Sequence, residues 1–86
     1  MPTRPDACLI EQYIESSPSR PGVEEARLRE YGVPVWALIG HYQAVGRDPR
    51  QVAADYELPL AAVEAALAYY RRHRAAIDAR IAANAA

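Results

Sequence analysis

Residues 58–83 read LPLAAVEAALAYYRRHRAAIDARIAA, and this stretch decides the fold. It has no glycine, and its one proline, Pro59, stands at the start, where a helix tolerates that residue. The larger side chains recur at steps of three or four, with Arg74 filling the one missing place: Leu60, Val63, Leu67, Tyr70, Ile77 and Ile81. Such heptad-like spacing predicts one long helix laid along a partner surface.

The rest of the chain is too short to cover the second half of this helix. At about 1.5 Å per residue, the helix reaches roughly 35 Å, which is about the width of a small domain. We therefore expect residues from Tyr70 onward to project and to dock on a second copy of the chain or on another protein. The predicted docking surface consists of Tyr70, Arg71, Arg74, Ile77 and Ile81. Tyrosine and arginine are enriched at interface hot spots. Arg74 lies in an otherwise apolar stripe, where a carboxylate of the partner would pair with its charge. The alternative is an ordinary helix in which Arg74 points to water and Tyr70 caps the core.

Two shorter helices are predicted before the long one. Pro34 suits a first helical position, and Gly46 ends the helix, whose apolar face is Val35, Leu38, Ile39, Tyr42 and Val45. Asp48 is a good N-cap and Pro49 a good first residue for a helix of about two turns. A tight turn at Glu57-Leu58 then leads into the long helix. A helix, a short helix, a turn and a third helix form the helix-turn-helix layout.

The first third of the chain is less regular. Residues 1–24 are predicted as an arm and a short element, and residues 25–86 as the helix-turn-helix domain with its extended C-terminal helix. Ala7–Ser16 has helical spacing but also alternates tolerably as a strand, and we favour a short helix. The run SSPSRPG breaks the chain, and Val23–Val35 is expected to form a hairpin turning near Tyr31-Gly32. The predicted fold class is mainly α, with a winged-helix-like helix-turn-helix core, a short N-terminal β-hairpin and a long C-terminal helix.

Composition limits the cell compartment and the partners. The net charge is -1 and the pI is near 6.1, so the chain has no global basic field for nucleic acid. The single cysteine, Cys8, excludes an internal disulfide, and no signal peptide or run of about 20 apolar residues is visible. We therefore expect a cytoplasmic protein that does not cross a membrane. Much of the hydrophobic content is alanine, so a thin core favours a homodimer.

No catalytic set emerges from the sequence. His41 and His73 are expected to be solvated surface side chains, and Cys8 has no activating neighbour. No Cys/His spacing suits zinc, and no glycine-rich loop would cradle phosphate. We therefore expect no enzyme activity, no metal or other cofactor, and no small-molecule substrate.

The composition of the last helix argues against direct reading of DNA bases. In a helix-turn-helix, outward residues in the first turns of that helix contact base edges. Here those residues are Pro59, Ala61, Ala62, Glu64 and Ala65. None donates a hydrogen bond, and Glu64 would repel phosphate. The candidate DNA contacts are instead Arg47, Arg50 and Gln51, which suit phosphate rather than bases. The alternative for these three is a solvated surface.

The segment from Tyr31 to Ala79 carries a family resemblance. Its first motif is Gly32, Val33, Pro34, Val35 and Trp36; its second is Pro49, Val52, Asp55 and Tyr56; its third is Val63, Ala66, Leu67, Tyr69 and Tyr70. Together these motifs resemble the domain of unknown function 433 family, over roughly Glu25–Ile81. The resemblance implies a small hairpin-flanked helix-turn-helix protein of antitoxin type, with a PIN-related ribonuclease as its toxin. This chain has EEARLREYG where family members often have a Gly-Arg-Pro-containing motif, and the added acid argues against nucleic-acid contact through the hairpin.

Three functions follow as hypotheses. The first is an antitoxin-like protein that neutralises a toxin through its C-terminal helix, with repression of its own promoter as a further role. The second is a stand-alone DNA-binding regulator that reads phosphate and shape. The third is a dimeric scaffold protein without a nucleic-acid role. Salt-dependent DNA binding would separate the second from the other two.

Overall fold

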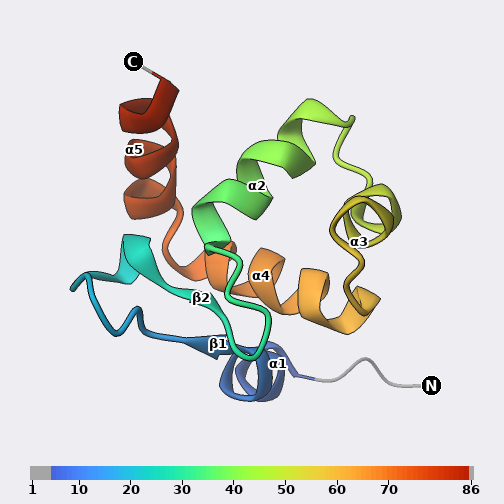
Figure 1. Ribbon diagram of the computed structural model, residues 1–86, viewed down its shortest axis with the longest axis horizontal. Helices are drawn as coiled ribbons and strands as arrows, with labels where there is room; N and C mark the ends of the chain where they lie inside the picture. Colours follow the sequence, from blue (N-terminus) through green and yellow to red (C-terminus); the bar gives the residue numbers. More distant parts are fainter. Residues whose placement is uncertain (1–4, 86) are drawn as a thin grey trace.

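A computed structural model describes residues 5–85 of the chain (Figure 1). Within these residues lie the helices and strands α1 (Asp6–Tyr13), β1 (Ile14–Glu15), the 3₁₀ helix η1 (Val23–Glu25), β2 (Arg27–Leu28), α2 (Val35–Ala44), α3 (Pro49–Tyr56), α4 (Leu60–Arg72) and α5 (Arg74–Ala85). The predicted fold class is confirmed: the chain is mainly helical, with a short hairpin near the N-terminus and a long helical run at the C-terminus. The first four residues of the predicted arm lie outside the described part.

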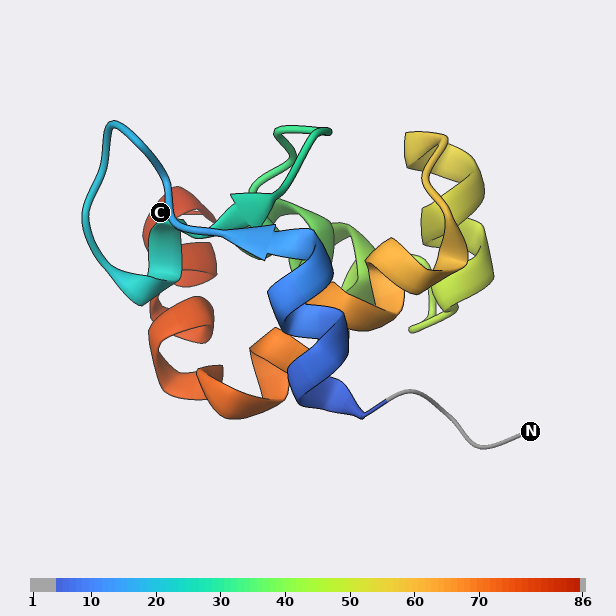
Figure 2. The same cartoon turned by 90° about the horizontal axis from the view of Figure 1, so that it is seen from below.

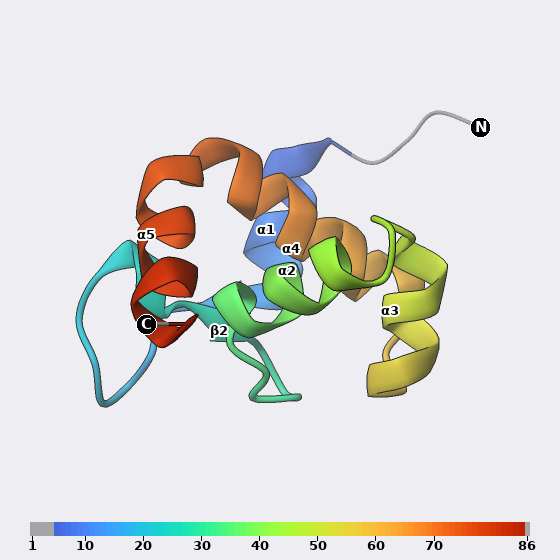
Figure 3. The same ribbon diagram turned by 90° about the horizontal axis from the view of Figure 1, so that it is seen from above.

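Helix α4 lies at the centre of the fold. Helix α1 covers one side of it and α2 the opposite side, while α3 crosses one end (Figures 1 and 3). The buried residues of α4 are therefore mostly small: Ala62, Val63, Ala65, Ala66, Ala68 and Tyr69. The predicted stripe is rotated from this face, because Leu60, Leu67 and Tyr70 are only partly buried. Alanine lets neighbouring helices approach α4 from two sides, whereas the prediction gave weight only to the larger side chains.

Local signals place α2, α3 and α4 where the sequence predicts them. The Asp48 carboxylate caps α3 by accepting hydrogen bonds from the backbone N–H groups of Arg50 at 3.0 Å and Gln51 at 3.3 Å. Glu57 ends α3 in the left-handed conformation, with φ 56°. The next residue, Leu58, is buried and donates its N–H to the Ala53 carbonyl at 2.8 Å. This tight turn sends the chain directly into α4.

The hairpin pairs different segments from those predicted. Ile14 pairs with Leu28 and Glu15 with Arg27, so the first strand precedes the proline-rich loop rather than following it. The segment 7–16 is therefore a helix that leads straight into a strand. The predicted return at residues 33–35 exists as a single bridge between Arg27 and Pro34. It stays that short because α2 begins at Val35, directly after the bridge.

The C-terminal run bends at His73 instead of projecting as one straight helix. His73 has φ -131° and ψ 36°, and α5 turns away from the axis of α4 to pack along α2 and η1 (Figures 1 and 2). Ile77 is consequently 0% exposed in the core of its own chain, and Ile81 packs partly against that core. The prediction that Ile77 lies on an exposed docking surface is wrong for this conformation, because the bend returns it to the chain that carries it.

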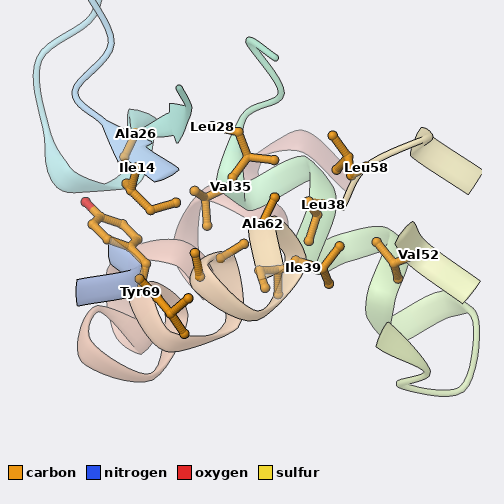
Figure 4. Close-up of a cluster of buried hydrophobic side chains, with 14 of the residues drawn as sticks. Ile14, Ala26, Leu28, Val35, Leu38, Ile39, Val52, Leu58, Ala62 and Tyr69 are labelled. Carbon is orange, nitrogen blue, oxygen red and sulfur yellow. The ribbon is translucent and has the colours of Figure 1, made fainter. Parts of the chain in front are cut away.

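One core joins all of these elements. Figure 4 shows its side chains converging from α2, α4, the hairpin and the turn before α4. Leu9 of α1 and Ile14 of β1 belong to the same cluster, so the segment assigned to an N-terminal arm helps to build the domain. None of the helices in residues 5–85 is long and apolar enough to cross a membrane.

Candidate functional site

A groove lies beside the C-terminal ends of α2 and α4. Its volume is about 220 Å³, and its lining residues are Tyr42, Gln43, Arg47, Leu67, Tyr70, Arg71 and Arg74. Residues from two separate sets of sequence-based candidates line this groove. Arg47 comes from the predicted DNA contacts, whereas Tyr70, Arg71 and Arg74 come from the predicted docking surface. The groove is therefore the candidate functional site.

The end of α2 positions Arg47. Gly46 and Arg47 are both left-handed, with φ 72° and 59°, and the Arg47 N–H donates to the Tyr42 carbonyl at 2.8 Å. This bond, spanning five residues, is the Schellman closure of a helix C-terminus. A left-handed backbone costs a residue with a side chain about 1 kcal/mol. Glycine at position 46 avoids this cost, so of the two turn residues only Arg47 bears it. The turn carries the Arg47 guanidinium past the helix end to the groove.

Contacts across the bend fix the opposite wall. The Tyr70 hydroxyl donates to Oδ1 of Asp78 at 2.7 Å, and the Arg74 guanidinium lies 5.3 Å from the centre of the Tyr70 ring. The hydrogen bond to Asp78 raises the pKa of Tyr70 above its usual value, and burial adds to this. The positive charges of Arg74 and Arg47 act in the opposite direction on the same pKa. Tyr70 therefore stays protonated and forms a fixed aromatic wall between two arginines.

The groove holds positive charge that the chain itself leaves unpaired. Most described arginines lie within 4 Å of a carboxylate: Arg20, Arg27, Arg29, Arg71 and Arg80. In residues 5–85, Arg47, Arg50, Arg72 and Arg74 make no ion pair. Arg47 and Arg74 face the groove, and the third arginine there, Arg71, holds Asp6 at 3.1 Å in a largely exposed pair. An anion is the ligand that this arrangement suits.

The other two predicted DNA contacts lie outside the groove. Arg50 is exposed at the start of α3 and makes no ion pair within the described residues. Gln51 is engaged internally, because its side-chain nitrogen donates to Oδ1 of Asp55 at 2.7 Å. The other oxygen of Asp55 lies 2.6 Å from Nε2 of His41, and these hydrogen bonds, His41 first, lower the pKa of Asp55. This exposed network joins α2 to α3, and His41 is less solvated than the sequence led us to expect.

Helix α4 cannot offer its first turns to DNA bases in this arrangement. Ala62 and Ala65 are both 0% exposed, and α1 packs against α4. Pro59 and Glu64 remain exposed, and neither is a hydrogen-bond donor to base edges. The residues that would face DNA bases thus lack hydrogen-bond donors, and two of them are also buried.

Three lining residues were not among the sequence-based candidates. Tyr42 and Leu67 were assigned to core faces, and Gln43 carried no signal of its own. The position of Tyr42 in the last turn of α2 was the available hint, because a tyrosine there can contribute both to a core and to a surface. No group of three or more His, Cys, Asp or Glu side chains in residues 5–85 is placed to hold a metal ion.

Fold and groove together define a small, mainly helical domain with a helix-turn-helix order and an arginine-rich surface groove. Comparison with known families gives one match, described as a protein of unknown function (DUF433), over residues 22–70. This match covers more than half of the chain, so the chain belongs to that family. It includes the groove residues Arg47 and Tyr70, whereas Arg71 and Arg74 follow the matched segment. No curated protein and no solved structure matches the chain.

Proposed function

We propose that this chain is a non-enzymatic, antitoxin-like binding protein of the cytoplasm that captures an acidic surface of a partner protein in its groove. The observation that carries the proposal is that Arg47 and Arg74 face the groove without an internal carboxylate. The chain therefore has two guanidinium groups ready for carboxylates from outside. The family resemblance supplies the kind of partner, a PIN-related ribonuclease.

The groove's size and lining favour side chains of a protein. Its volume of about 220 Å³ is below the roughly 300–1,000 Å³ of pockets for drug-sized ligands. Tyr42, Leu67 and Tyr70 add apolar and aromatic area beside the arginines. Arginine and tyrosine together are the residue types of interface hot spots, where a few side chains provide most of the binding energy. One or two acidic side chains of a partner fit this description.

The experiment is a calorimetric titration of the chain with the purified product of the neighbouring reading frame. We expect Arg74→Ala to weaken binding by about 2 kcal/mol, roughly thirtyfold, because it leaves a partner carboxylate unpaired at the interface. Arg72→Ala is the matched control, since Arg72 is also exposed and unpaired but does not line the groove. It should leave affinity within about twofold, as expected for a distant surface charge. No binding by the wild type, or equal losses for both variants, would contradict the proposal.

Promoter repression is the second candidate, and the exposure of Arg47 and Arg50 on either side of the Asp48 cap favours it. Both side chains are free to contact phosphate, while Ala62 and Ala65 of α4 are buried. Repression also calls for two copies, because helix-turn-helix proteins bind paired half-sites; the homodimer is part of this proposal. We expect Arg50→Ala to weaken binding to all DNA sequences alike and to flatten the salt slope by about one unit. A loss of specificity at one base pair on Glu64→Ala would instead support direct readout.

A further inference from the structure

The bend between α4 and α5 has no cause in the local sequence. Residues 71–76 read RRHRAA, and arginine and alanine are among the strongest helix formers. Sharp bends in helices are almost always found at proline, at small residues such as glycine, or at inserted groups. Here a single residue, His73, separates the two helices. By itself this segment favours a continuous helix.

The bend also interrupts the backbone hydrogen bonds. The His73 N–H donates to the carbonyls of Tyr69 and Tyr70, both at 3.1 Å, and the next bond across the junction runs from the Ile77 N–H to the His73 carbonyl at 3.0 Å. The N–H groups of residues 74–76 have no backbone acceptor among the described residues. A straight helix over residues 60–85 would satisfy all three.

Contacts with a distant part of the sequence hold α5 in its folded-back position. Arg80 donates to Oε2 of Glu25 at 2.8 Å and lies 4.2 Å from the ring centre of Trp36. Ile77 is buried in the same core. These contacts connect α5 with η1 and α2, which precede it by roughly 40–55 residues, and none of them requires both sides to belong to one chain.

We propose that two copies of this chain form a domain-swapped dimer. In each copy α4 and α5 join as one straight helix, and α5 packs on α2 and η1 of the other copy. The swap repeats the contacts of Ile77 and Arg80 between chains and restores the interrupted hydrogen bonds at residues 74–76. Exchange of an identical element across a two-fold axis gives a closed dimer at low cost. The swap concerns how the chain pairs with itself, so the proposal stands apart from partner binding at the groove.

The first test changes the helix preference of the bend. His73→Ala favours the straight helix and His73→Gly the bent one, with a difference of about fivefold per chain. Because formation of the dimer straightens two bends, its dissociation constant should be roughly 25-fold lower for His73→Ala than for His73→Gly, measured by size-exclusion chromatography with light scattering. Equal constants, or monomers for both variants at high micromolar concentration, would overturn the swap.

The second test identifies the chains in contact. Glu25→Cys and Arg80→Cys are prepared separately, each with Cys8→Ser, then mixed, unfolded together and refolded. A short bismaleimide should join the two variants into a covalent dimer, because Glu25 and Arg80 meet across chains in the swap. The double variant on one chain is the positive control for reagent reach. A dimer that forms without this cross-link, while the double variant reacts within one chain, would show that α5 is not exchanged.

Discussion

Burial of the single residue Ile77 helps to hold the C-terminal helix in its folded-back position. Fully burying an isoleucine side chain is worth about 1.5–3 kcal/mol relative to leaving it in water. The bend forgoes three backbone hydrogen bonds, each worth about 0.5–1.5 kcal/mol. These amounts are similar, so the additional contacts of Arg80 with Glu25 and Trp36 help to decide in favour of the folded-back helix. Because the folded-back and straight conformations differ little in free energy, exchange of α5 between two copies is feasible.

Asp55 gives the fold a defined response to acid. Its pKa is lowered by hydrogen bonds from His41 and Gln51, so the folded state favours the carboxylate. A carboxyl group with a depressed pKa in the folded state adds stability above its ordinary pKa, and that stability is lost as pH falls through the folded value. We expect the free energy of unfolding to fall less steeply for Asp55→Asn than for the wild type below about pH 4.

Urea unfolding at a series of pH values from neutral to acid measures this difference. Glu64→Gln serves as a control, because Glu64 is exposed and makes no ion pair or side-chain hydrogen bond in the described part of the chain. Its acid slope should stay closer to that of the wild type. Parallel slopes for Asp55→Asn and the wild type would show that the network between α2 and α3 does not affect the acid response.

Among the elements, those with local start and stop signals could be predicted. Asp48 and Pro49 fix the start of α3, and Gly46 ends α2, because caps and left-handed turns depend on a few neighbouring residues. The partner of β2 could not be predicted in the same way. Strand pairing depends on contacts between distant segments, and Ile14 lies across a proline-rich loop from Leu28.

The bend at His73 could not be predicted from the sequence. Helix preference and spacing both indicate continuity there, and the competing contacts come from Glu25 and Trp36, far away in the sequence. The candidate site likewise joins residues that are far apart in the sequence. Tyr70, Arg71 and Arg74 could be selected by residue type, but their meeting with Arg47 is a consequence of tertiary structure.

At the scale of the whole molecule, charge is separated despite a net value of -1. Carboxylates such as Glu15 and Glu25 pair with arginines around the hairpin and α5, which leaves Arg47 and Arg74 unpaired at the groove. A weakly acidic chain can therefore present a local positive site to an acidic partner. Arg74 is the first residue of α5 and follows the bend at His73 directly.

Amide hydrogen exchange of the monomer, resolved by residue with NMR, tests the folded-back conformation of α5 most directly. In the folded-back conformation the N–H groups of residues 74–76 lack backbone acceptors, whereas the Ile77 N–H is bonded to His73. We expect fast exchange at residues 74–76, between slow amides of α4 and a protected Ile77, since exchange follows the opening of hydrogen bonds. Continuous protection from Tyr70 to Ile77 in the monomer would contradict the folded-back conformation, because the N–H groups of residues 74–76 would then be bonded as in a straight helix.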